Sequence, residues 1–227
     1  MAADCLRITF FNSTTASPCI LWLAATPATH ESSRSFSHPT HPATMVPAPL
    51  NFPKWISENE HLLAPPVGNF CLYKSQDYTV MAVGGPNARS DYHYQPTEEF
   101  FYQYKGAMLL KIVEDGIFKD VRIAEGEMFM LPANTPHSPV RFANTIGLVV
   151  ERTRPEALED AMRWYCPNIS AHPSPHIVKE SRFLCTDLGT QLKPVIQAWA
   201  SSSDQERTCK ECGKVVGVRE LIGALEA

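Results

Sequence analysis

The stretch RSDYHYQPTEEFFYQ, residues 89–103, decides the fold of this chain. It is rich in aromatic residues and is interrupted at residues 95–97, so it predicts a strand, a bend and a second strand. His93 then lies near the end of the first strand. Because successive side chains of a strand point to opposite faces, Glu98 and Glu99 point in opposite directions. Only one of these two carboxylates can therefore share a site with His93.

The segments that follow are short, apolar or alternating, at residues 107–113, 118–123 and 127–131. Turn residues separate them, which predicts an antiparallel meander with tight turns. A second histidine, His137, comes next, on a strand predicted to continue to Glu151. Such strands close into a barrel with room inside for one metal and one small ligand. We therefore predict a mainly β fold, a small antiparallel β-barrel with a few peripheral helices.

Two imidazoles and one carboxylate, from His93, His137 and Glu99, can hold one divalent metal and leave coordination positions open. This ligand set is typical of non-haem Fe(II) oxygenases. The simpler interpretation is that each histidine is a surface residue or a hydrogen-bonded core residue. The glycines and prolines spaced around the three residues favour the metal site.

This spacing resembles the two motifs of the cupin family, whose fold is a double-stranded β-helix. The matching residues of the first motif are Gly84, Gly85, His93, Glu99 and Gly106, and those of the second are Gly126, Pro132 and His137. The chain departs from the motifs at three positions. Gln95 replaces a second histidine, Asn134 replaces a glycine, and Arg141 replaces the final asparagine.

Within the cupins, the chain resembles the 3-hydroxyanthranilate 3,4-dioxygenase family from about Leu50 to Cys212. The segments that carry the resemblance are residues 84–94, 97–103, 131–141, 147–152 and 187–194. The resemblance implies Fe(2+) as cofactor and the opening of the ring of 3-hydroxyanthranilate by O2. The product would close to quinolinate, on the route from tryptophan to NAD.

The resemblance also implies a role for each site residue. His93, Glu99 and His137 would be the metal ligands, and Glu99 would also border the substrate. Arg89 and Arg141 would bind the ring carboxylate, since a guanidinium suits planar recognition, and Arg89 would also contact O2.

Glu151 would hydrogen-bond the substrate amine and could accept a proton as the catalytic base. Simpler interpretations stand beside these roles. The two arginines could be solvated surface charges, which is the usual place of arginine. Glu151 could simply pair with Arg152 or Arg154 at the end of a strand.

Length and composition suit a small enzyme. The 227 residues, 44% hydrophobic and 19% charged, are enough for one domain with a core. The net charge of -4 gives no basic field, so nucleic acid is not expected as a partner. No apolar run approaches the roughly 18 residues that span a bilayer. We therefore expect a soluble, cytoplasmic enzyme with no membrane partner, and the family makes a homodimer plausible.

The first 45 residues differ in composition from the rest. They are rich in Ser, Thr, Ala and Pro, which predicts a disordered extension. A targeting peptide is less convincing because only Arg7 and Arg34 are basic there. Met45 could be the working start. We expect the catalytic barrel at residues 46–155 and a C-terminal helical and loop extension at 156–227, with a helix at 156–165.

Cys209 and Cys212 form a CxxC pair, which is half of a metal knuckle. Bacterial relatives hold a second iron between two such pairs, but Ile169 stands where a partner of Cys166 would fall. Cys185, His172 or His176 could complete a second site with Cys166, Cys209 and Cys212. The alternative is free thiols, and an odd total of seven cysteines argues for a reducing compartment.

Two other classes of function remain open. A cupin isomerase would use Zn or Mn for chemistry without oxidation, and a metal-free cupin would only bind a ligand. Gln95 in place of a fourth ligand, together with two arginines, favours the dioxygenase.

Overall fold

The computed structural model describes residues 47–64, 68–87 and 89–218, without the side chains of residues 188–190. The chain divides into two compact units, residues 1–48 and 49–227. All helices and strands named below lie in the second unit. The predicted disordered extension, residues 1–45, lies outside the described residues.

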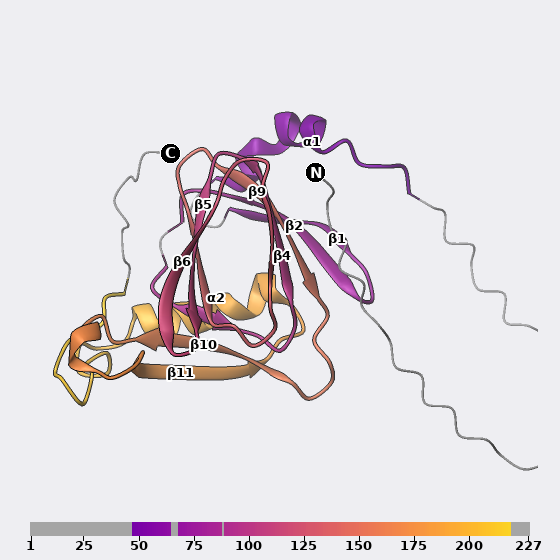
Figure 1. The fold of residues 1–227 in the computed structure, drawn as a ribbon. Coiled ribbons are helices and arrows are strands. Elements are labelled where there is room, and N and C mark those ends of the chain that lie inside the picture. The colour runs from indigo at the N-terminus through magenta and orange to yellow at the C-terminus, as the bar shows by residue number, and fades with distance from the viewer. Residues whose placement is uncertain (1–46, 65–67, 88, 219–227) are drawn as a thin grey trace, which may run out of the picture. The chain divides into compact units, whose positions relative to one another are not determined.

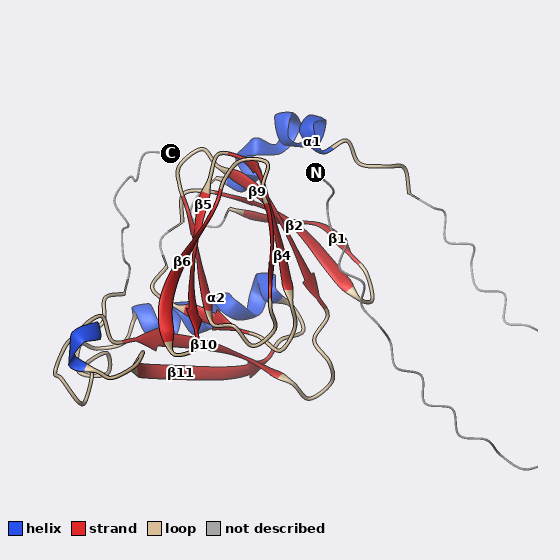
Figure 2. Cartoon of the chain, viewed as in Figure 1, coloured by secondary structure: helices blue, strands red, loops and turns tan. Residues whose placement is uncertain are grey.

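Two antiparallel sheets face each other in this unit (Figures 1 and 2). The first contains, in spatial order, β1 (Asn69–Lys74), β2 (Tyr78–Gly84), β9 (Ile146–Arg152), β4 (Glu99–Lys105) and β7 (Met128–Leu131). The second contains β11 (Ile177–Leu184), β10 (Glu159–Tyr165), β3 (Tyr92–Tyr94), β8 (His137–Arg141), β5 (Met108–Glu114) and β6 (Ile117–Ile123). The helices are α1 (Phe52–Asn59) and α2 (Leu188–Ala200), with 3-10 turns at Glu60–Leu63 and Ile169–Ala171.

The main apolar core lies between the two sheets. The first sheet contributes Met81, Phe101, Leu131 and Val149, and the second contributes Met108, Leu110, Ile112 and Ile123. Alternation along β4 buries Glu99, Phe101 and Gln103, while Glu98 is exposed, as the sequence predicted. The mainly β prediction is confirmed, with two open sheets in place of one closed barrel.

The predicted meander is wrong in its last step. β5 and β6 form the expected hairpin around Asp115 and Gly116, both with positive φ. The next strand, β7, crosses to the other sheet and pairs with β4. This crossing is favourable because it brings Leu131 into the core between the sheets. The single strand expected up to Glu151 is also wrong, since a turn at Asn144, with φ 61, separates β8 from β9.

The helix predicted at residues 156–165 is wrong as well. This segment contains β10, which pairs with both β3 and β11. Ala161, Met162 and Trp164 are almost fully buried, so sheet pairing and burial on both faces outweigh the helical spacing of the apolar residues. The division into three parts along the chain stays a prediction.

α2 packs against β10 (Figure 1), and Trp199 stacks on Trp164 with ring centroids 4.6 Å apart. Met162 belongs to this contact and is the register partner of His93, so both side chains project from the same face of the sheet. The helix therefore covers the sheet next to the position of His93.

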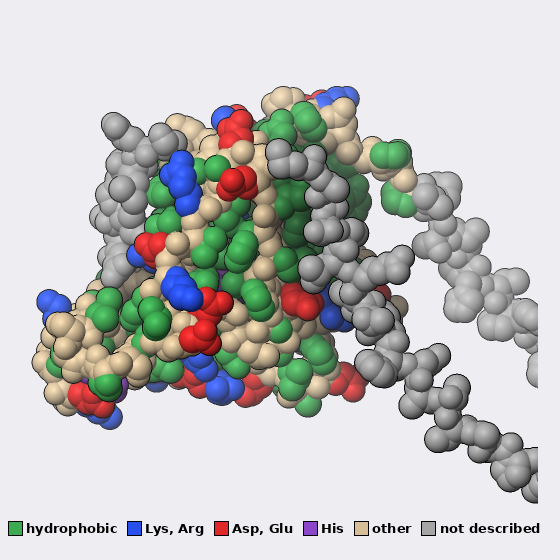
Figure 3. All heavy atoms as spheres, in the orientation of Figure 1, with side chains coloured by type: hydrophobic (Ala, Val, Ile, Leu, Met, Phe, Trp, Pro, Cys, Tyr) green, Lys and Arg blue, Asp and Glu red, His purple; other side chains and the backbone are tan. Residues whose placement is uncertain are grey.

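Acidic and basic side chains are interspersed on the face drawn in Figure 3, with apolar side chains between them. None of the helices in the described part of the chain is both long and apolar enough to cross a membrane.

Candidate functional site

Strand register builds the site from both sheets. β3 and β8 place His93 opposite His137, and β4 and β9 place Glu99 opposite Glu151. The possible ligand atoms of His93, Glu99 and His137 lie within 4.8 Å of one another, and all three side chains are buried. The structure therefore brings together the three residues that the sequence proposed as metal ligands.

His137 is held in one orientation. Its Nδ1 donates to the carbonyl oxygen of Thr135 at 3.0 Å, which leaves Nε2 facing Glu99 Oε2 at 2.9 Å. Burial would by itself raise the pKa of Glu99, but the charges of His137, His93 and Arg154 hold it below its ordinary value. Glu99 is therefore an ionised carboxylate, as a metal ligand must be.

His93 has a carboxylate beside it that the sequence did not suggest. Its Nε2 lies 2.8 Å from Oδ2 of Asp160, and Asp160 is fully buried. Burial lowers the pKa of His93, although the bond to Asp160 acts in the opposite direction. A neutral imidazole anchored through one nitrogen can offer the other nitrogen to a metal.

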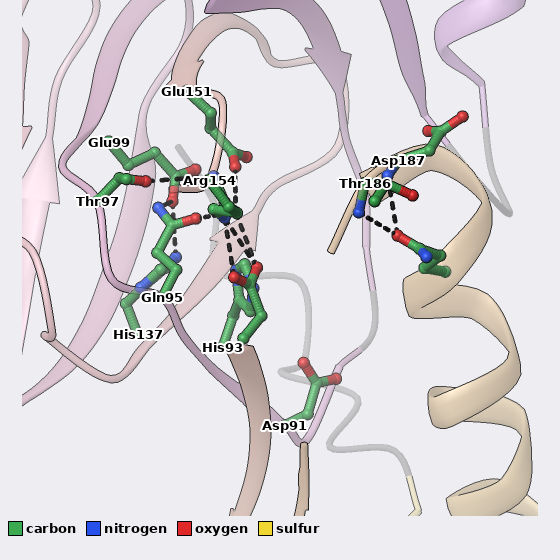
Figure 4. A network of polar contacts seen from close by, with 12 residues as sticks. Asp91, His93, Gln95, Thr97, Glu99, His137, Glu151, Arg154, Thr186 and Asp187 are labelled. Atoms are coloured by element: carbon green, nitrogen blue, oxygen red, sulfur yellow. Dashed lines mark hydrogen bonds and ion pairs between the residues drawn. The ribbon is translucent and has the colours of Figure 1, made fainter. Parts of the chain in front are cut away.

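Gln95, which stands where the cupin motif has a second histidine, takes a different place. Its Nε2 donates to Glu99 Oε2 at 2.9 Å, and its Oε1 accepts from Arg154 (Figure 4). Gln95 thus supports a ligand and leaves the count of protein ligands at three.

Arg141 is a buried guanidinium, 3% exposed, with no ion pair to any described carboxylate. Its guanidinium makes a long contact, from Nη1 to Gln103 Oε1 at 3.4 Å. Burial lowers the pKa of Arg141 to about 10. Gly147 makes room for it, because a Cβ there would lie 2.9 Å from Arg141 Nη1. No pattern in the sequence indicated that this glycine borders Arg141.

Arg89 is more accessible than Arg141 and has a partner. Its Nε and Nη2 donate to Oδ2 of Asp91 at 3.1 and 2.5 Å, and its side chain is 22% exposed. Burial would lower the pKa of Arg89, but Asp91 raises it. Arg89 is therefore a cation held in place by Asp91, which binds the edge of the guanidinium formed by Nε and Nη2.

Glu151 pairs with Arg154, as the simpler interpretation expected, through Nη2 and Oε2 at 2.8 Å. Burial and the charge of Glu99 nevertheless raise the pKa of Glu151 to about 8, against the effect of Arg154. A cavity of about 300 Å³ is bordered by Glu151, Arg154 and Cys185. This volume is at the lower end of the range for small-ligand pockets.

The family model for 3-hydroxyanthranilic acid dioxygenase matches residues 45–200. This chain belongs to the 3-hydroxyanthranilate 3,4-dioxygenase family. It is 72% identical over 177 residues to the 3-hydroxyanthranilate 3,4-dioxygenase of Mycosarcoma maydis, covering 77% of this chain and 97% of the relative. The enzyme of the same name from Neurospora crassa is 57% identical over 182 residues, covering 80% of this chain and 97% of the relative.

Among solved structures, a cupin-2 domain containing protein from Shewanella frigidimarina matches with a TM-score of 0.37 and 16% identity, covering 43% of this chain and 91% of that chain. KdgF from Halomonas sp. matches with a TM-score of 0.34 and 13% identity, covering 41% of this chain and 84% of that chain. The two facing antiparallel sheets agree with the mainly β architecture that the motifs predicted.

A second cluster of metal-ligating side chains lies in the C-terminal part of the chain. Cys166, His172, Cys209 and Cys212 place one possible ligand atom each within 4.8 Å of the others. Cys166 and Cys212 have Sγ atoms 3.5 Å apart, and His172 Nε2 lies 3.6 Å from Cys209 Sγ. Of the residues proposed to complete this site, the structure selects His172, and Cys185 lines the cavity beside Glu151.

The surroundings favour a thiolate at Cys209, whereas burial raises the pKa of Cys166 to about 11. Burial alone would raise the pKa of Cys209, but the N–H groups of Cys212 and Glu211 lower it to about 7. His172 Nδ1 bonds to Glu211 Oε2 at 3.0 Å, which turns Nε2 towards the cysteines. A carboxylate behind a ligating histidine is the usual arrangement at protein metal sites.

Proposed function

We propose that this chain is a 3-hydroxyanthranilate 3,4-dioxygenase that uses Fe(2+) held by His93, Glu99 and His137. The proposal rests on family membership and, above all, on Arg141, a buried guanidinium without a carboxylate partner among the described residues. Arg141 and His137 are four residues apart on β8, so their side chains leave the same face of the strand. A substrate carboxylate would give Arg141 the partner that the described residues do not supply.

The donor set fits Fe(2+). Two imidazoles and one ionised carboxylate, all buried, are the ligands of non-haem Fe(II) oxygenases. When bound, the ion would supply open coordination positions and the redox chemistry that O2 requires. Gln95 keeps those positions open because its amide is bonded to Glu99 and Arg154.

The arginines would orient the substrate. Arg141 would bind the ring carboxylate with charge-assisted hydrogen bonds, which are strong in a buried site. Arg89 would contribute the edge of its guanidinium that Asp91 leaves unused, and would also border O2. The ring hydroxyl and amine of the substrate would then face the three ligands.

Glu151 would accept a proton from the amine or hydroxyl as the substrate binds. A pKa raised to about 8 matches this role, since a general base works best when its pKa lies near the operating pH. Both atoms of O2 end in the product, 2-amino-3-carboxymuconate semialdehyde, which cyclises to quinolinate with loss of water.

The test is direct. The metal-free protein is loaded anaerobically with Fe(2+) and then mixed with 3-hydroxyanthranilate and O2. We expect O2 uptake equal to substrate consumed, the absorbance of the ring-opened product, and its decay to quinolinate. An isomerase or a simple binding protein would consume no O2, and that result would refute the proposal.

We further propose that Cys166, His172, Cys209 and Cys212 bind a structural divalent metal, with Zn(2+) as the expected ion. Three cysteines and one histidine form a closed tetrahedral set typical of structural zinc. Elemental analysis of the purified chain should then find a second metal per chain that remains after the Fe(2+) site is emptied. Free thiols that react fully with a thiol reagent in the folded protein would refute this second proposal.

The homodimer, inferred from the family, and the cytoplasmic location, inferred from the sequence, stay predictions. Light scattering of the purified chain tests the first, and cell fractionation tests the second.

A further inference from the structure

Arg154 lies at the centre of the polar network around the ligands (Figure 4). It follows β9, and its side chain is 4% exposed. Its Nε donates to Asp160 Oδ1 at 2.8 Å, and its Nη2 donates to Asp160 Oδ2 at 2.9 Å and Glu151 Oε2 at 2.8 Å. It also donates to Gln95 Oε1 and to Thr97 Oγ1, the latter at 3.3 Å. One guanidinium thus forms ion pairs with two buried carboxylates, those of Asp160 and Glu151.

Three of these partners, Asp160, Gln95 and Glu151, contact a proposed ligand or have a role of their own in the proposed reaction. Asp160 accepts from Nε2 of the ligand His93 at 2.8 Å. Gln95 donates to the ligand Glu99 at 2.9 Å. Glu151 is the proposed base. Arg154 therefore reaches two of the three proposed ligands through one intervening side chain each, and it contacts the proposed base directly.

We propose that Arg154 and Asp160 are positioning residues for the ring-opening reaction, an inference that rests on the proposed function. Asp160 fixes the ring orientation and the tautomer of His93. Arg154 holds Asp160, Gln95 and Glu151 in a single arrangement. Carboxylates behind metal-ligating histidines set the direction of the donor atom and increase its basicity.

The arrangement also decides what Gln95 can do. The guanidinium of Arg154 carries only hydrogen-bond donors, so the amide of Gln95 turns its oxygen towards Arg154. The amide nitrogen of Gln95 then faces Glu99. This orientation gives Glu99 a hydrogen-bond donor. A metal-binding side chain at position 95 would lose the contact with Arg154.

A purely structural role is the competing explanation. Arg154 Nη1 also donates to the carbonyl oxygen of Arg152 at 2.9 Å, so it could simply hold the connection between β9 and β10. A structural clamp would affect stability alone. A positioning residue affects metal affinity, the geometry of the metal site and the response to substrate.

The experiment compares Asp160→Asn, Arg154→Lys and Arg154→Met with the control Arg163→Met. Arg163 lies on β10, the strand of Asp160, but it pairs with Glu180 at 2.5 Å and lies over the ring of Tyr94, 4.1 Å from its centroid. The control therefore loses a partly buried arginine and its ion pair on the same strand, outside the network around the ligands. Four quantities are measured: thermal stability, Fe(2+) affinity by competition with a chelator, the visible spectrum of the Co(2+) form, and kcat and KM.

We expect Asp160→Asn to weaken Fe(2+) binding by about tenfold or more, within the usual range for residues behind a ligand, and to alter the Co(2+) spectrum. Arg154→Met should do both and also raise KM, because Glu151 loses its partner. Arg154→Lys should recover part of each loss. If Arg154→Met does not fold, Asp160→Asn and Arg154→Lys carry the test.

The inference is overturned if these variants lose stability as Arg163→Met does while keeping the wild-type Fe(2+) affinity, Co(2+) spectrum, kcat and KM. The metal affinity and the spectrum need no turnover. A failure of the proposed ring-opening activity in the wild-type chain therefore remains distinguishable from a failure of the positioning roles.

Discussion

The two clusters of metal-ligating residues differ in donor chemistry and in surroundings. The first offers two imidazoles and one carboxylate and is surrounded by charged side chains, among them Arg141, Arg154 and Glu151. The second offers three sulfur atoms and one imidazole. Four protein ligands complete a tetrahedral ion, whereas three leave room on an octahedral one. This difference is the reason for the proposal that the first cluster serves the chemistry and the second holds the chain.

The two clusters also differ in the elements that carry them. His93, Glu99 and His137 lie on β3, β4 and β8, so hydrogen-bonded strands set their positions before any metal binds. The second cluster lies in the turns that follow β10 and α2, where local turn bonds, such as those from Cys209 N–H to Lys214 O and from Gly213 N–H to Cys209 O, take the place of strand pairing. Strands hold the side chains of a site in a more precise geometry than loops do. The second cluster should therefore depend more on its metal for order.

The largest expected effect is that of His137→Ala. The variant removes one of three protein ligands, so it should lose most bound Fe(2+) and nearly all ring opening, while the metal of the second cluster is retained. Elemental analysis and O2 uptake measure both. Full iron occupancy with normal activity would show that His137 is not a ligand. Loss of both metals would show that the clusters are not independent.

Alternation along one strand showed that Glu98 and Glu99 point to opposite faces, since a period of two residues needs only local sequence. The motif spacing then selected Glu99, which the structure buries. The spacing of glycines and prolines added His93 and His137. These predictions concern residues whose positions follow from their own strand and from a recurring motif.

Asp160 and Arg154 could not be found in this way. Asp160 reaches His93 only because β10 pairs with β3, a contact between residues 67 positions apart. The apolar spacing of residues 156–165 also suits a helix, and a helix would have placed Asp160 elsewhere. Arg154 lies in the loop between β9 and β10, and in a loop no sequence periodicity predicts the direction of a side chain.

Beside the first cluster lies Glu151, whose pKa is raised by burial to about 8, and the pH profile of Glu151→Gln sharpens the contrast. A base must be deprotonated, so wild-type kcat/KM should fall about tenfold per pH unit below the pKa of Glu151. That pKa is about 8 without metal, and it should be lower with Fe(2+) because the ion offsets the charge of Glu99. Glu151→Gln should lose about 100-fold in rate and this acid limb.

The measurement is kcat/KM of both proteins between about pH 6 and 9, at saturating Fe(2+). The metal content at each pH serves as the control, because acid also removes iron from histidine ligands. If both proteins share one pH profile, Glu151 is not the titrating group.

Arg141→Ala should have a smaller effect, limited to substrate binding. Removing the guanidinium should leave iron content unchanged and weaken binding of 3-hydroxyanthranilate by about 1.5 to 3 kcal/mol, the usual range for hydrogen bonds to charged groups. The control is 2-aminophenol, which lacks the ring carboxylate and should bind wild type and variant alike. Equal losses for both compounds would mean that Arg141 is structural.

The smallest expected effect on ring opening belongs to Cys209→Ser, and it tests the contrast between the clusters most directly. The variant should lose the second metal but keep kcat and KM within about twofold, because no residue of the second cluster belongs to the network around His93. Stability should fall instead. A metal present at about 100 times its dissociation constant stabilises the folded state by about 2.7 kcal/mol, and the variant loses this contribution. Cys71→Ser, at an exposed cysteine outside both clusters, is the matched control and should leave metal content and stability unchanged. If Cys209→Ser lowers kcat at a temperature where the variant is fully folded, the second cluster influences the chemistry, and the division between a catalytic and a structural site does not hold.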